Sequence, residues 1–262
     1  MQNVTAPIIS MLTDFGSHDP YVGVMKGVML ARCPEARIVD LTHDVPPQNI
    51  HAAGYLLGAN WRYFPPGTVH LVVIDPGVGG ERRILAVQTG GHTFLAPDNG
   101  LLSELLEHSP ADRIVSVENE SLFVQPVSRT FHGRDVFAPV AAALAGGLPI
   151  DDVGPAANGY LHLPGIRPQR DADGQVSGEI IWIDHFGNLV TNITVDQLPS
   201  APRIEVGGRV MYGLTNSYGN VGAGEPLALI GSTSRLEIAV NHGNAAESLG
   251  MDMGDPVHVR SE

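Results

Sequence analysis

Apolar residues form short continuous runs in the first two thirds of the chain, and segments with helical spacing stand between them. Three runs have the length and β-branched content of buried parallel strands: Ile8–Leu12, Ile38–Leu41 and Val69–Ile74. Two further runs suggest a hairpin: Ile84–Thr89 and Thr93–Ala96. Helices are expected over Tyr21–Arg32, Ile50–Trp61, Leu101–Leu106 and Phe137–Leu148. This alternation predicts an α/β domain with a parallel or mixed sheet.

The pattern changes at residues 163–174, where proline, glycine and charged residues concentrate as they do in linkers. Beyond this stretch come short β-type runs separated by turn residues: Gly178–Ile183, Leu189–Ile193, Arg203–Val206, Leu227–Ile230, Leu236–Val240 and Pro256–Val259. They predict a smaller all-β domain, a barrel or a sandwich. We therefore expect an N-terminal α/β catalytic domain over residues 1–165 and a C-terminal β domain over residues 166–262. The linker is expected at residues 164–176.

Composition and charge narrow the possible partners. The net charge of −13 disfavours nucleic acid or an anionic membrane as partners, because both attract clustered Lys and Arg. The single cysteine, Cys33, excludes an intrachain disulfide and any site of several thiolates. Residues 1–4 lack the positive flank of a signal peptide, and the longest uncharged stretch, Val136–Ile150, is too short to span a bilayer. We expect a cytoplasmic protein.

Polar motifs follow two of the predicted strands. Thr13-Asp14-Phe15-Gly16 ends the first strand, and a glycine-rich segment that contains Asp75 and Arg82 ends the strand at Val69–Ile74. A third motif, Thr130–Asp135, opens an Ala-rich helix. Open α/β sheets bind ligands beyond the carboxyl ends of their strands, so Asp14 and Asp75 are expected near the site.

Two interpretations of these motifs are disfavoured. The turn Gly77-Val78-Gly79-Gly80 lacks the spacing of a dinucleotide-binding fingerprint, and two arginines follow where the helix should begin. A binuclear metallohydrolase could use oxygen and imidazole ligands from Asp14, Asp75, Asp98, Asn99, His132 and Asp135. The histidines of the N-terminal half stand singly, however, which is atypical of such sites. Asp98 or Asn99 is instead a candidate helix cap, and Arg134-Asp135 a candidate structural ion pair.

Six motifs occur in a characteristic order along the chain: Thr13–Gly16, Asp75–Gly79 with Arg82, Pro97–Gly100, Phe131–Asp135, Asp184–Asn188 and Ser234–Ala239. With them the chain closely resembles the S-adenosyl-L-methionine (SAM) hydroxide adenosyltransferases. These form the hydrolase branch of a family that also includes the SAM-dependent fluorinases and chlorinases. The resemblance runs almost from end to end. It implies an N-terminal α/β domain, a C-terminal barrel-like β domain and a homotrimer with active sites between subunits.

The resemblance also implies a reaction and its catalytic residues. Asp75, Arg82 and His132 match the set that holds a nucleophilic water, which attacks the ribose 5′ carbon of SAM to give adenosine and L-methionine. The sulfonium is already an excellent leaving group, so the enzyme has to activate water. General base assistance is worth about 10²–10⁴-fold. No metal and no cofactor are expected, since SAM is the substrate. The halogenases carry tyrosine where Asp75 and His132 stand, which favours the hydrolase branch.

Further positions match substrate ligands of the family. Asp14 resembles the aspartate that binds the ribose 2′ and 3′ hydroxyls. The methionine end is matched by Asp19, Asp184, Ser234 and Arg235, with the guanidinium suited to bidentate capture of the carboxylate. The adenine is matched by Asn188 and by the backbone near Asn244 and Ala245. Without the resemblance, Asp184 and Asn188 would be read as ordinary turn residues and His132 as a core histidine.

Two alternative functions stay open on the sequence alone. One is a sensor that binds SAM or adenosine without catalysis, and the other is a metal-dependent hydrolase. Retention of Asp75, Arg82 and His132 argues against the sensor, because a sensor has no use for groups that activate water.

Overall fold

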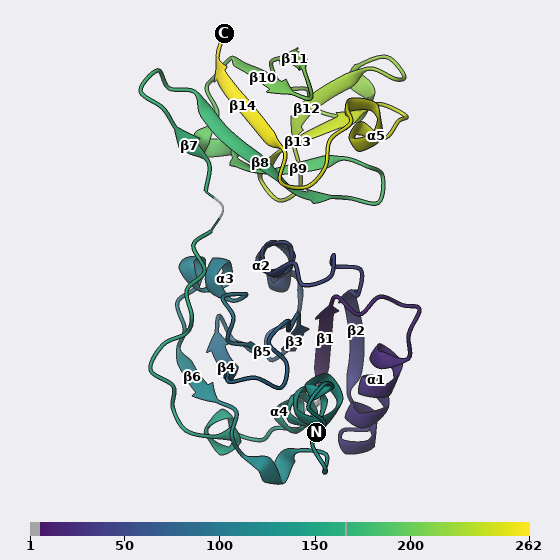
Figure 1. The fold of residues 1–262 in the computed structure, drawn as a ribbon, viewed down its shortest axis with the longest axis vertical. Coiled ribbons are helices and arrows are strands. Elements are labelled where there is room, and N and C mark those ends of the chain that lie inside the picture. The colour runs from purple at the N-terminus through teal and green to yellow at the C-terminus, as the bar shows by residue number, and fades with distance from the viewer. Residues whose placement is uncertain (1–5, 166) are drawn as a thin grey trace, which may run out of the picture. The chain divides into compact units, whose positions relative to one another are not determined.

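The computed structural model describes residues 6–165 and 167–262, so Ile166, within the predicted linker, and residues 1–5 lie outside the described part. The chain divides into two compact units, Met1–Gly165 and Ile166–Glu262, which are described in turn (Figure 1). We call them the N-terminal and the C-terminal unit.

The N-terminal unit is built on a six-stranded mixed sheet with the order β2-β1-β3-β5-β4-β6. The strands are β1 (Ile8–Thr13), β2 (Arg37–Thr42), β3 (Val69–Val73), β4 (Ile84–Thr89), β5 (His92–Pro97) and β6 (Arg113–Ser116). The neighbours β2, β1, β3 and β5 pair in parallel, whereas β4 runs antiparallel to both β5 and β6. The predicted hairpin of β4 and β5 is therefore confirmed, and so is the mixed sheet.

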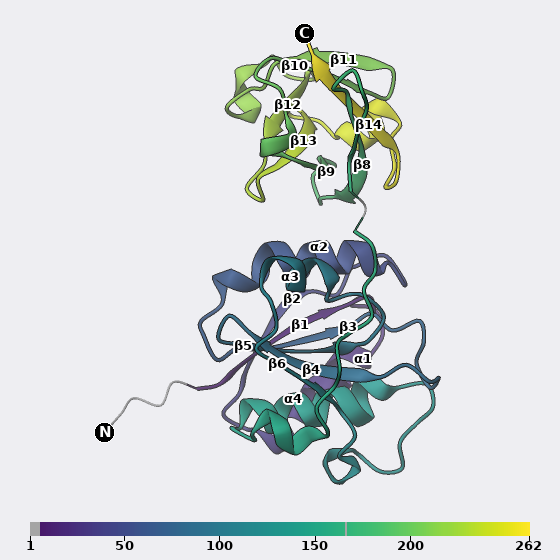
Figure 2. The same cartoon turned by 90° about the vertical axis from the view of Figure 1, so that its left-hand side faces the viewer.

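Helices cover both faces of this sheet (Figure 2). One face carries α1 (Tyr21–Arg32) and α4 (Ala138–Ala145), and the other carries α2 (Ile50–Asn60) and α3 (Ser103–His108). Short helical turns connect these elements at Trp61–Tyr63, Glu120–Leu122, Gly133–Phe137 and Ile150–Val153. The expected cap of α3 is wrong: the helix begins two residues later than predicted, and neither Asp98 nor Asn99 caps it.

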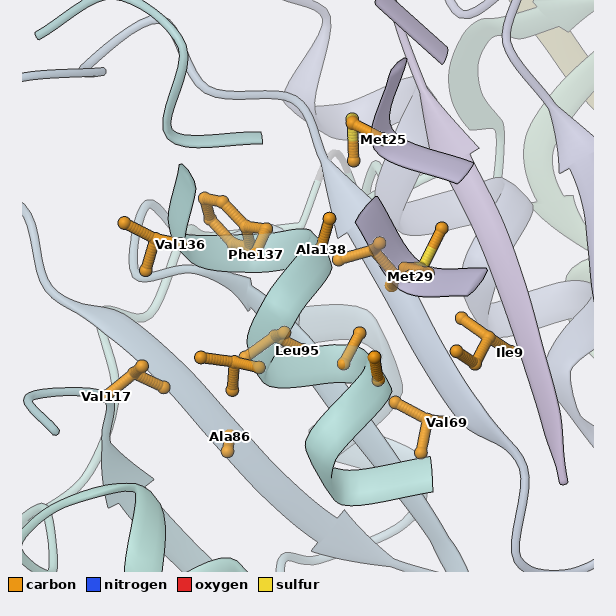
Figure 3. Close-up of a cluster of buried hydrophobic side chains, with 14 of the residues drawn as sticks. Ile9, Met25, Met29, Val69, Ala86, Leu95, Val117, Val136, Phe137 and Ala138 are labelled. Carbon is orange, nitrogen blue, oxygen red and sulfur yellow. The ribbon is translucent and has the colours of Figure 1, made fainter. Parts of the chain in front are cut away.

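The main core lies between the sheet and the helix pair α1 and α4. From α1, Met25 and Met29 are fully buried, as their spacing of four residues on one helix face requires. Phe137 belongs to the same cluster, which also includes the strand residues Ile9 and Leu95 (Figure 3). Burial on both faces explains why the central strands read as continuous apolar runs.

Polar side chains are buried on the opposite face of the same sheet. The Ser10 Oγ lies 2.6 Å from His70 Nδ1, and His70 Nε2 lies 3.1 Å from His92 Nδ1. The His70 ring stacks on Phe94 with a centroid distance of 4.7 Å. Burial, helped by the neighbouring His92, lowers the pKa of His70 to about 3. This histidine is therefore neutral in the folded protein at neutral pH.

The C-terminal unit is an eight-stranded antiparallel sheet with the order β11-β10-β14-β8-β9-β13-β12, with β7 paired to β8. The strands are β7 (Gln169–Arg170), β8 (Val176–Ile183), β9 (Leu189–Thr194), β10 (Pro202–Val206), β11 (Arg209–Tyr212), β12 (Pro226–Ile230), β13 (Arg235–Val240) and β14 (Pro256–Ser261). The one α-helix of the described part of this unit is α5 (Ala245–Leu249). The strand β7 falls inside the predicted linker, so that linker is partly structured.

The sheet of the C-terminal unit curls until its two edge strands approach. Thr215, just after β11, donates its backbone N–H to the carbonyl of Ala228 in β12 at 2.8 Å. This bond nearly closes the sheet into a barrel around a buried apolar cluster that includes Ile204, Leu236 and Val257. The predicted fold class, an α/β domain followed by a barrel-like β domain, is confirmed. No helix in the described residues is long and apolar enough to cross a bilayer.

We predict that the free energy of unfolding falls as the pH drops from about 6.5 to about 3. His70 binds a proton near pH 6.5 in the unfolded chain but only near pH 3 in the folded protein, so the unfolded state binds more protons in this window. The expected slope from this group is up to about 1.4 kcal/mol per pH unit. Denaturant unfolding of wild type and His70→Asn at several pH values measures it. The variant should be less stable at pH 7 but less acid-sensitive; an equal acid slope would contradict the assignment.

Candidate active site

The strand register brings Asp14 and Asp75 to one edge of the sheet. Strands β1 and β3 pair in parallel with Thr13 opposite Val73, so the chain leaves the sheet at Asp14 in one strand and at Ile74-Asp75 in the other. The Oδ2 atom of Asp14 accepts a hydrogen bond of 2.8 Å from the backbone N–H of Gln48. The expectation that both aspartates lie at the carboxyl ends of neighbouring strands holds.

A glycine-rich turn folds the chain back over Asp75. Val78 N–H bonds to the Asp75 carbonyl at 3.2 Å, and Gly79 takes the left-handed conformation with φ 74°. A Cβ atom at Gly79 would collide with the carbonyl oxygen of Arg129, so only glycine allows this close approach of the two loops. The turn sets Arg82 beside both Asp75 and the segment that carries His132.

Arg82 joins Asp75 and His132 into one hydrogen-bonded unit. Its Nε lies 2.8 Å from Asp75 Oδ1 and 3.0 Å from Oδ2, and its Nη2 pairs with Oδ2 as well. The same Nη2 lies 2.9 Å from His132 Nδ1. The side chains of Asp75 and Arg82 are only 5% and 12% exposed, so solvent screens the ion pair little. The three residues that the sequence predicted as catalytic are thus in direct contact.

The contact with Arg82 fixes the protonation of His132. A guanidinium has five N–H donors and no acceptor, so Nδ1 of His132 accepts and the ring proton of the neutral form sits on Nε2. Burial lowers the pKa of His132 below its usual value, and the charge of Arg82 lowers it further, while Asp75 and Asp135 act in the opposite sense. The ring is therefore neutral at pH 7, with Nε2–H as its remaining polar group.

Two other acidic residues of these motifs, Asp135 and Asp98, form ion pairs that stabilise the fold. Asp135 is fully buried; it accepts two bonds from Arg134, at 2.6 and 2.9 Å, and one of 2.8 Å from Ser128 N–H. The pair Arg134–Asp135 is thus the structural ion pair considered from the sequence. Asp98 accepts from Arg83 at 2.6 and 2.8 Å.

Asp98 and Asn99 also form hydrogen bonds to neighbouring backbone groups. Asp98 accepts from the N–H of Leu161 at 2.7 Å, and Asn99 donates to the carbonyl of Ile74 at 2.8 Å.

Within residues 6–165 and 167–262, no three His, Cys, Asp or Glu side chains are grouped so that they could hold a metal ion. Asp19 lies exposed in the loop between β1 and α1.

In the C-terminal unit, Asp184 organises the turn between β8 and β9. Its Oδ1 accepts from the N–H groups of Phe186 and Asn188, both at 2.9 Å, and its Oδ2 accepts from the side chain of Asn188 at 2.9 Å. Asp184 therefore stabilises this turn. The same bonds fix the orientation of the Asn188 side chain.

The start of α5 lies against this turn. Asn244 caps the helix by accepting from Glu247 N–H at 3.0 Å, and Ala246 N–H bonds to the Gly187 carbonyl at 3.0 Å. Gly187, with φ 83°, leaves no room for a Cβ beside the Asn244 side chain. The residues predicted to read adenine, Asn188 with Asn244 and Ala245, are thus brought together.

Ser234 and Arg235 lie at the other end of β13 from this group. Arg235 pairs with Thr194, whereas Ile238 pairs with Leu189, next to the Asp184–Asn188 turn. Ser234 takes a left-handed conformation with φ 60°, and Arg235 donates to the carbonyl of Asn192 at 3.2 Å. Of the residues predicted to bind the methionine end, the structure therefore separates Arg235 from Asp184.

Sequence reasoning missed polar contacts beside these residues. The Tyr218 hydroxyl donates to Glu237 Oε1 at 2.6 Å, and burial raises the pKa of Glu237, with Asp184 adding to the effect. The sequence did contain a signal for this contact, because Glu237 is a charged residue inside the apolar run of β13. Gln48, which holds Asp14 through its backbone, left no signal, because a backbone donor does not depend on the side chain.

The fold and this geometry define a class: a two-unit α/β and β protein with a carboxylate, a guanidinium and an imidazole joined at the strand ends. Residues 9–154 match the model of the SAM hydroxide adenosyltransferase N-terminal domain, and residues 178–258 match that of the C-terminal domain. The chain belongs to the SAM hydroxide adenosyltransferase family, which confirms the resemblance noted from its motifs.

Relatives and solved structures agree with this assignment. The chain is 40% identical to an (R)-S-adenosyl-L-methionine hydrolase of Thermus thermophilus, over 96% of this chain and 98% of the relative. A protein of that name from Salinispora tropica is 39% identical over 97% of both chains. A fluorinase of an Actinoplanes species is 28% identical, again over 97% of both. The crystal structure of an uncharacterized conserved protein from Thermotoga maritima superposes with a TM-score of 0.89 at 39% identity, covering 96% of this chain and 99% of the other.

We predict that Arg82→Met raises the pKa of His132. The substitution removes a positive charge and the donor to Nδ1, so the charges of Asp75 and Asp135 are no longer opposed. Titration of the His132 ring by NMR measures the change. Arg83→Met is the matched control, because this neighbouring guanidinium binds Asp98 instead. An unchanged His132 pKa in Arg82→Met would show that burial alone sets it.

Proposed function

We propose that this protein hydrolyses SAM to adenosine and L-methionine by attack of an activated water on the ribose 5′ carbon. The observation that carries the proposal is the hydrogen-bonded unit of Asp75, Arg82 and His132. Membership of the SAM hydroxide adenosyltransferase family and four relatives named SAM hydrolase, 36–40% identical, support it.

The reaction needs little from the protein at the leaving group. The oxygen of water forms a bond to C5′ while the bond from C5′ to sulfur breaks, and its electron pair neutralises the sulfonium. The products are adenosine, whose 5′ hydroxyl contains the water oxygen, and methionine with a neutral thioether. One proton leaves the water. The barrier therefore depends on orienting the water and accepting this proton.

The hydrogen-bond directions divide these tasks among the three residues. Nδ1 of His132 is occupied by Arg82, so Nε2–H can only donate, and it stabilises hydroxide character on the attacking oxygen. Asp75 is the one residue of the unit with free acceptor lone pairs, and we assign it the proton. Arg82 holds both partners in place. The unit needs no metal ion for this chemistry.

The substrate-binding residues follow the same proposal. Asp14, fixed through Oδ2 by Gln48, accepts from the ribose hydroxyls. We assign the methionine end to Asp19, Asp184, Ser234 and Arg235, and the adenine to Asn188, Asn244 and Ala245. Asn188 and Asn244 are pre-oriented by the bonds of their turn and helix cap, which lowers the entropic cost of reading a flat base.

We further propose that the protein works in the cytoplasm as a homotrimer with its active sites at subunit interfaces. The proposed ligands support this, because Asp14 and Asp75 belong to one unit of the chain while Asn188 and Arg235 belong to the other. Light scattering of the purified protein should give three times the chain mass. A fully active monomer would contradict the proposal.

We predict that Asp75→Asn, Arg82→Ala and His132→Ala each lower kcat for SAM by about 10²-fold or more, with smaller effects on KM. These groups act on the water, so their removal destabilises the transition state more than it weakens substrate binding. The double variants should be markedly non-additive, because the residues serve one water together. Chromatography of adenosine and methionine provides the rates.

Asp98→Asn is the control for this series, since that carboxylate only anchors Arg83 and Leu161. Added chelator should leave the activity intact. Activity that a chelator abolishes and a divalent ion restores would favour a metal-dependent hydrolase. Tight SAM binding by wild type without any products would favour a sensor.

A further inference from the structure

A second chain of polar contacts ends one residue before Asp14. Lys26 Nζ lies 2.6 Å from Asp40 Oδ2, and Asp40 Oδ1 lies 3.0 Å from His43 Nε2. His43 Nδ1 in turn lies 2.8 Å from Thr13 Oγ1. The chain of contacts therefore runs from α1 through β2 and the following loop to the last residue of β1. None of these residues belongs to the Asp75–Arg82–His132 unit.

An irregularity in the sheet makes these contacts possible. In the pairing of β1 with β2, Met11 stands opposite Asp40, whereas Leu12 stands opposite Thr42. The extra residue in β2 is a bulge, a feature that re-aims side chains at strand ends. It sets Asp40 close to His43, three residues further on. Thr13 is fully buried and His43 is 9% exposed, so water competes little for their bond.

The Asp40 carboxylate is the acceptor of this chain of contacts. The Asp40 carboxylate is ionised: burial tends to raise its pKa, but the hydrogen bonds from Lys26 and His43 lower it overall. An ionised carboxylate only accepts, and His43 Nε2 lies 3.0 Å from it, while Nδ1 of the same ring bonds the Thr13 hydroxyl at 2.8 Å. The Oγ1 atom of Thr13 then accepts from the N–H of Phe15 at 3.3 Å.

The loop that carries His43 also holds the Asp14 segment through its backbone. Gly16 N–H donates to the His43 carbonyl at 2.8 Å, and Gln48 N–H donates to Asp14 Oδ2 at 2.8 Å. Gln48 takes the uncommon left-handed conformation, with φ 64°. Asp14 is thus held through its carboxylate, and His43 holds Thr13, the residue before it, and Gly16, two residues after it.

We infer that Thr13, His43 and Asp40 are positioning residues that set the orientation of Asp14 toward the ribose of the substrate. The inference rests on the proposed function of Asp14. Hydrogen bonds to two adjacent hydroxyls require both carboxylate oxygens in a defined plane, and small misplacements cost affinity. Their contacts do not include Asp75, Arg82 or His132, so they act on ribose selectivity rather than on the chemical step.

The test compares the affinities of the full-length protein for adenosine and 2′-deoxyadenosine, measured by calorimetry. Thr13→Val keeps the shape of the side chain and removes the hydroxyl. We expect the preference of wild type for adenosine to fall about tenfold, KM for SAM to rise by a similar factor, and kcat to stay within about twofold.

Ser10→Ala is the matched control. It removes an equivalent buried bond between a hydroxyl and an imidazole, Ser10 to His70, from the same strand. This variant should lower thermal stability yet keep the preference for adenosine. A loss of preference equal to that of Thr13→Val would mean that any cavity in β1 disturbs the site, and would overturn the inference.

Two substitutions of His43 test the same inference independently of Thr13. Asn places its amide where Nδ1 lies and can still bond Thr13, whereas Gln reaches toward Asp40 and leaves Thr13 without a partner. His43→Asn should therefore keep more of the adenosine preference than His43→Gln. Equal preferences in wild type and in both folded variants would overturn the positioning role while leaving the proposed reaction in place.

Measurements on the wild type distinguish a failure of the positioning role from a failure of the proposed reaction. A wild type that cleaves SAM but binds both nucleosides equally would refute the ribose role of Asp14 and the inference with it. A wild type that prefers adenosine but does not cleave SAM would refute the proposed reaction, and the Thr13 and His43 comparisons would still decide the positioning role.

Discussion

The candidate active site depends on a single guanidinium that donates in two directions. One amino group of Arg82 carries two hydrogens, and the structure gives one to Asp75 and the other to His132. This sharing holds the carboxylate and the imidazole together and decides which imidazole nitrogen carries the proton. A lysine could not replace it, because an ammonium lacks the planar fork that reaches the carboxylate through Nε and Nη2 together. The tautomer of His132 that the proposed reaction needs is therefore set by hydrogen-bond geometry.

The elements that position these side chains also form part of the hydrophobic core. Strand β3 is buried along its whole length and ends at Val73, two residues before Asp75, so the core holds the start of the carboxylate's loop in place. The turn after β3 approaches the neighbouring loop so closely that Gly79 cannot be replaced. His132 directly precedes a π-helical turn, Gly133–Phe137, whose Phe137 is a fully buried core residue. π-Helical turns of this kind often occur at functional sites.

Much of this arrangement could be predicted from the sequence, because periodicity and motif order report on burial. The bounds of α1, Tyr21–Arg32, were predicted correctly, since its apolar spacing and flanking prolines are unambiguous. The start of α3 was misplaced, because Leu101 and Leu102 fit a helical pattern but lie in the turn before it. The short strand β11 was not predicted, because it is an edge strand with exposed Val210 and Tyr212.

The contacts that hold Asp14 were also beyond the sequence. Gln48 acts through a backbone N–H in a left-handed conformation, and His43 reaches Thr13 only because a bulge shifts the register of β2. Long-range side-chain pairs such as Ser10 with His70 likewise depend on strand order, which local patterns do not specify. Sequence motifs thus identified residue types for the site, whereas their hydrogen-bond directions required the fold.

The most direct test of the account is to follow the oxygen of water. Wild-type protein is incubated with SAM in water enriched in ¹⁸O, and the products are analysed by mass spectrometry. The account predicts that adenosine gains one ¹⁸O atom at its 5′ hydroxyl and that methionine gains none. Unlabelled adenosine, or ¹⁸O in a product derived from the amino acid, would contradict attack of water at the ribose carbon.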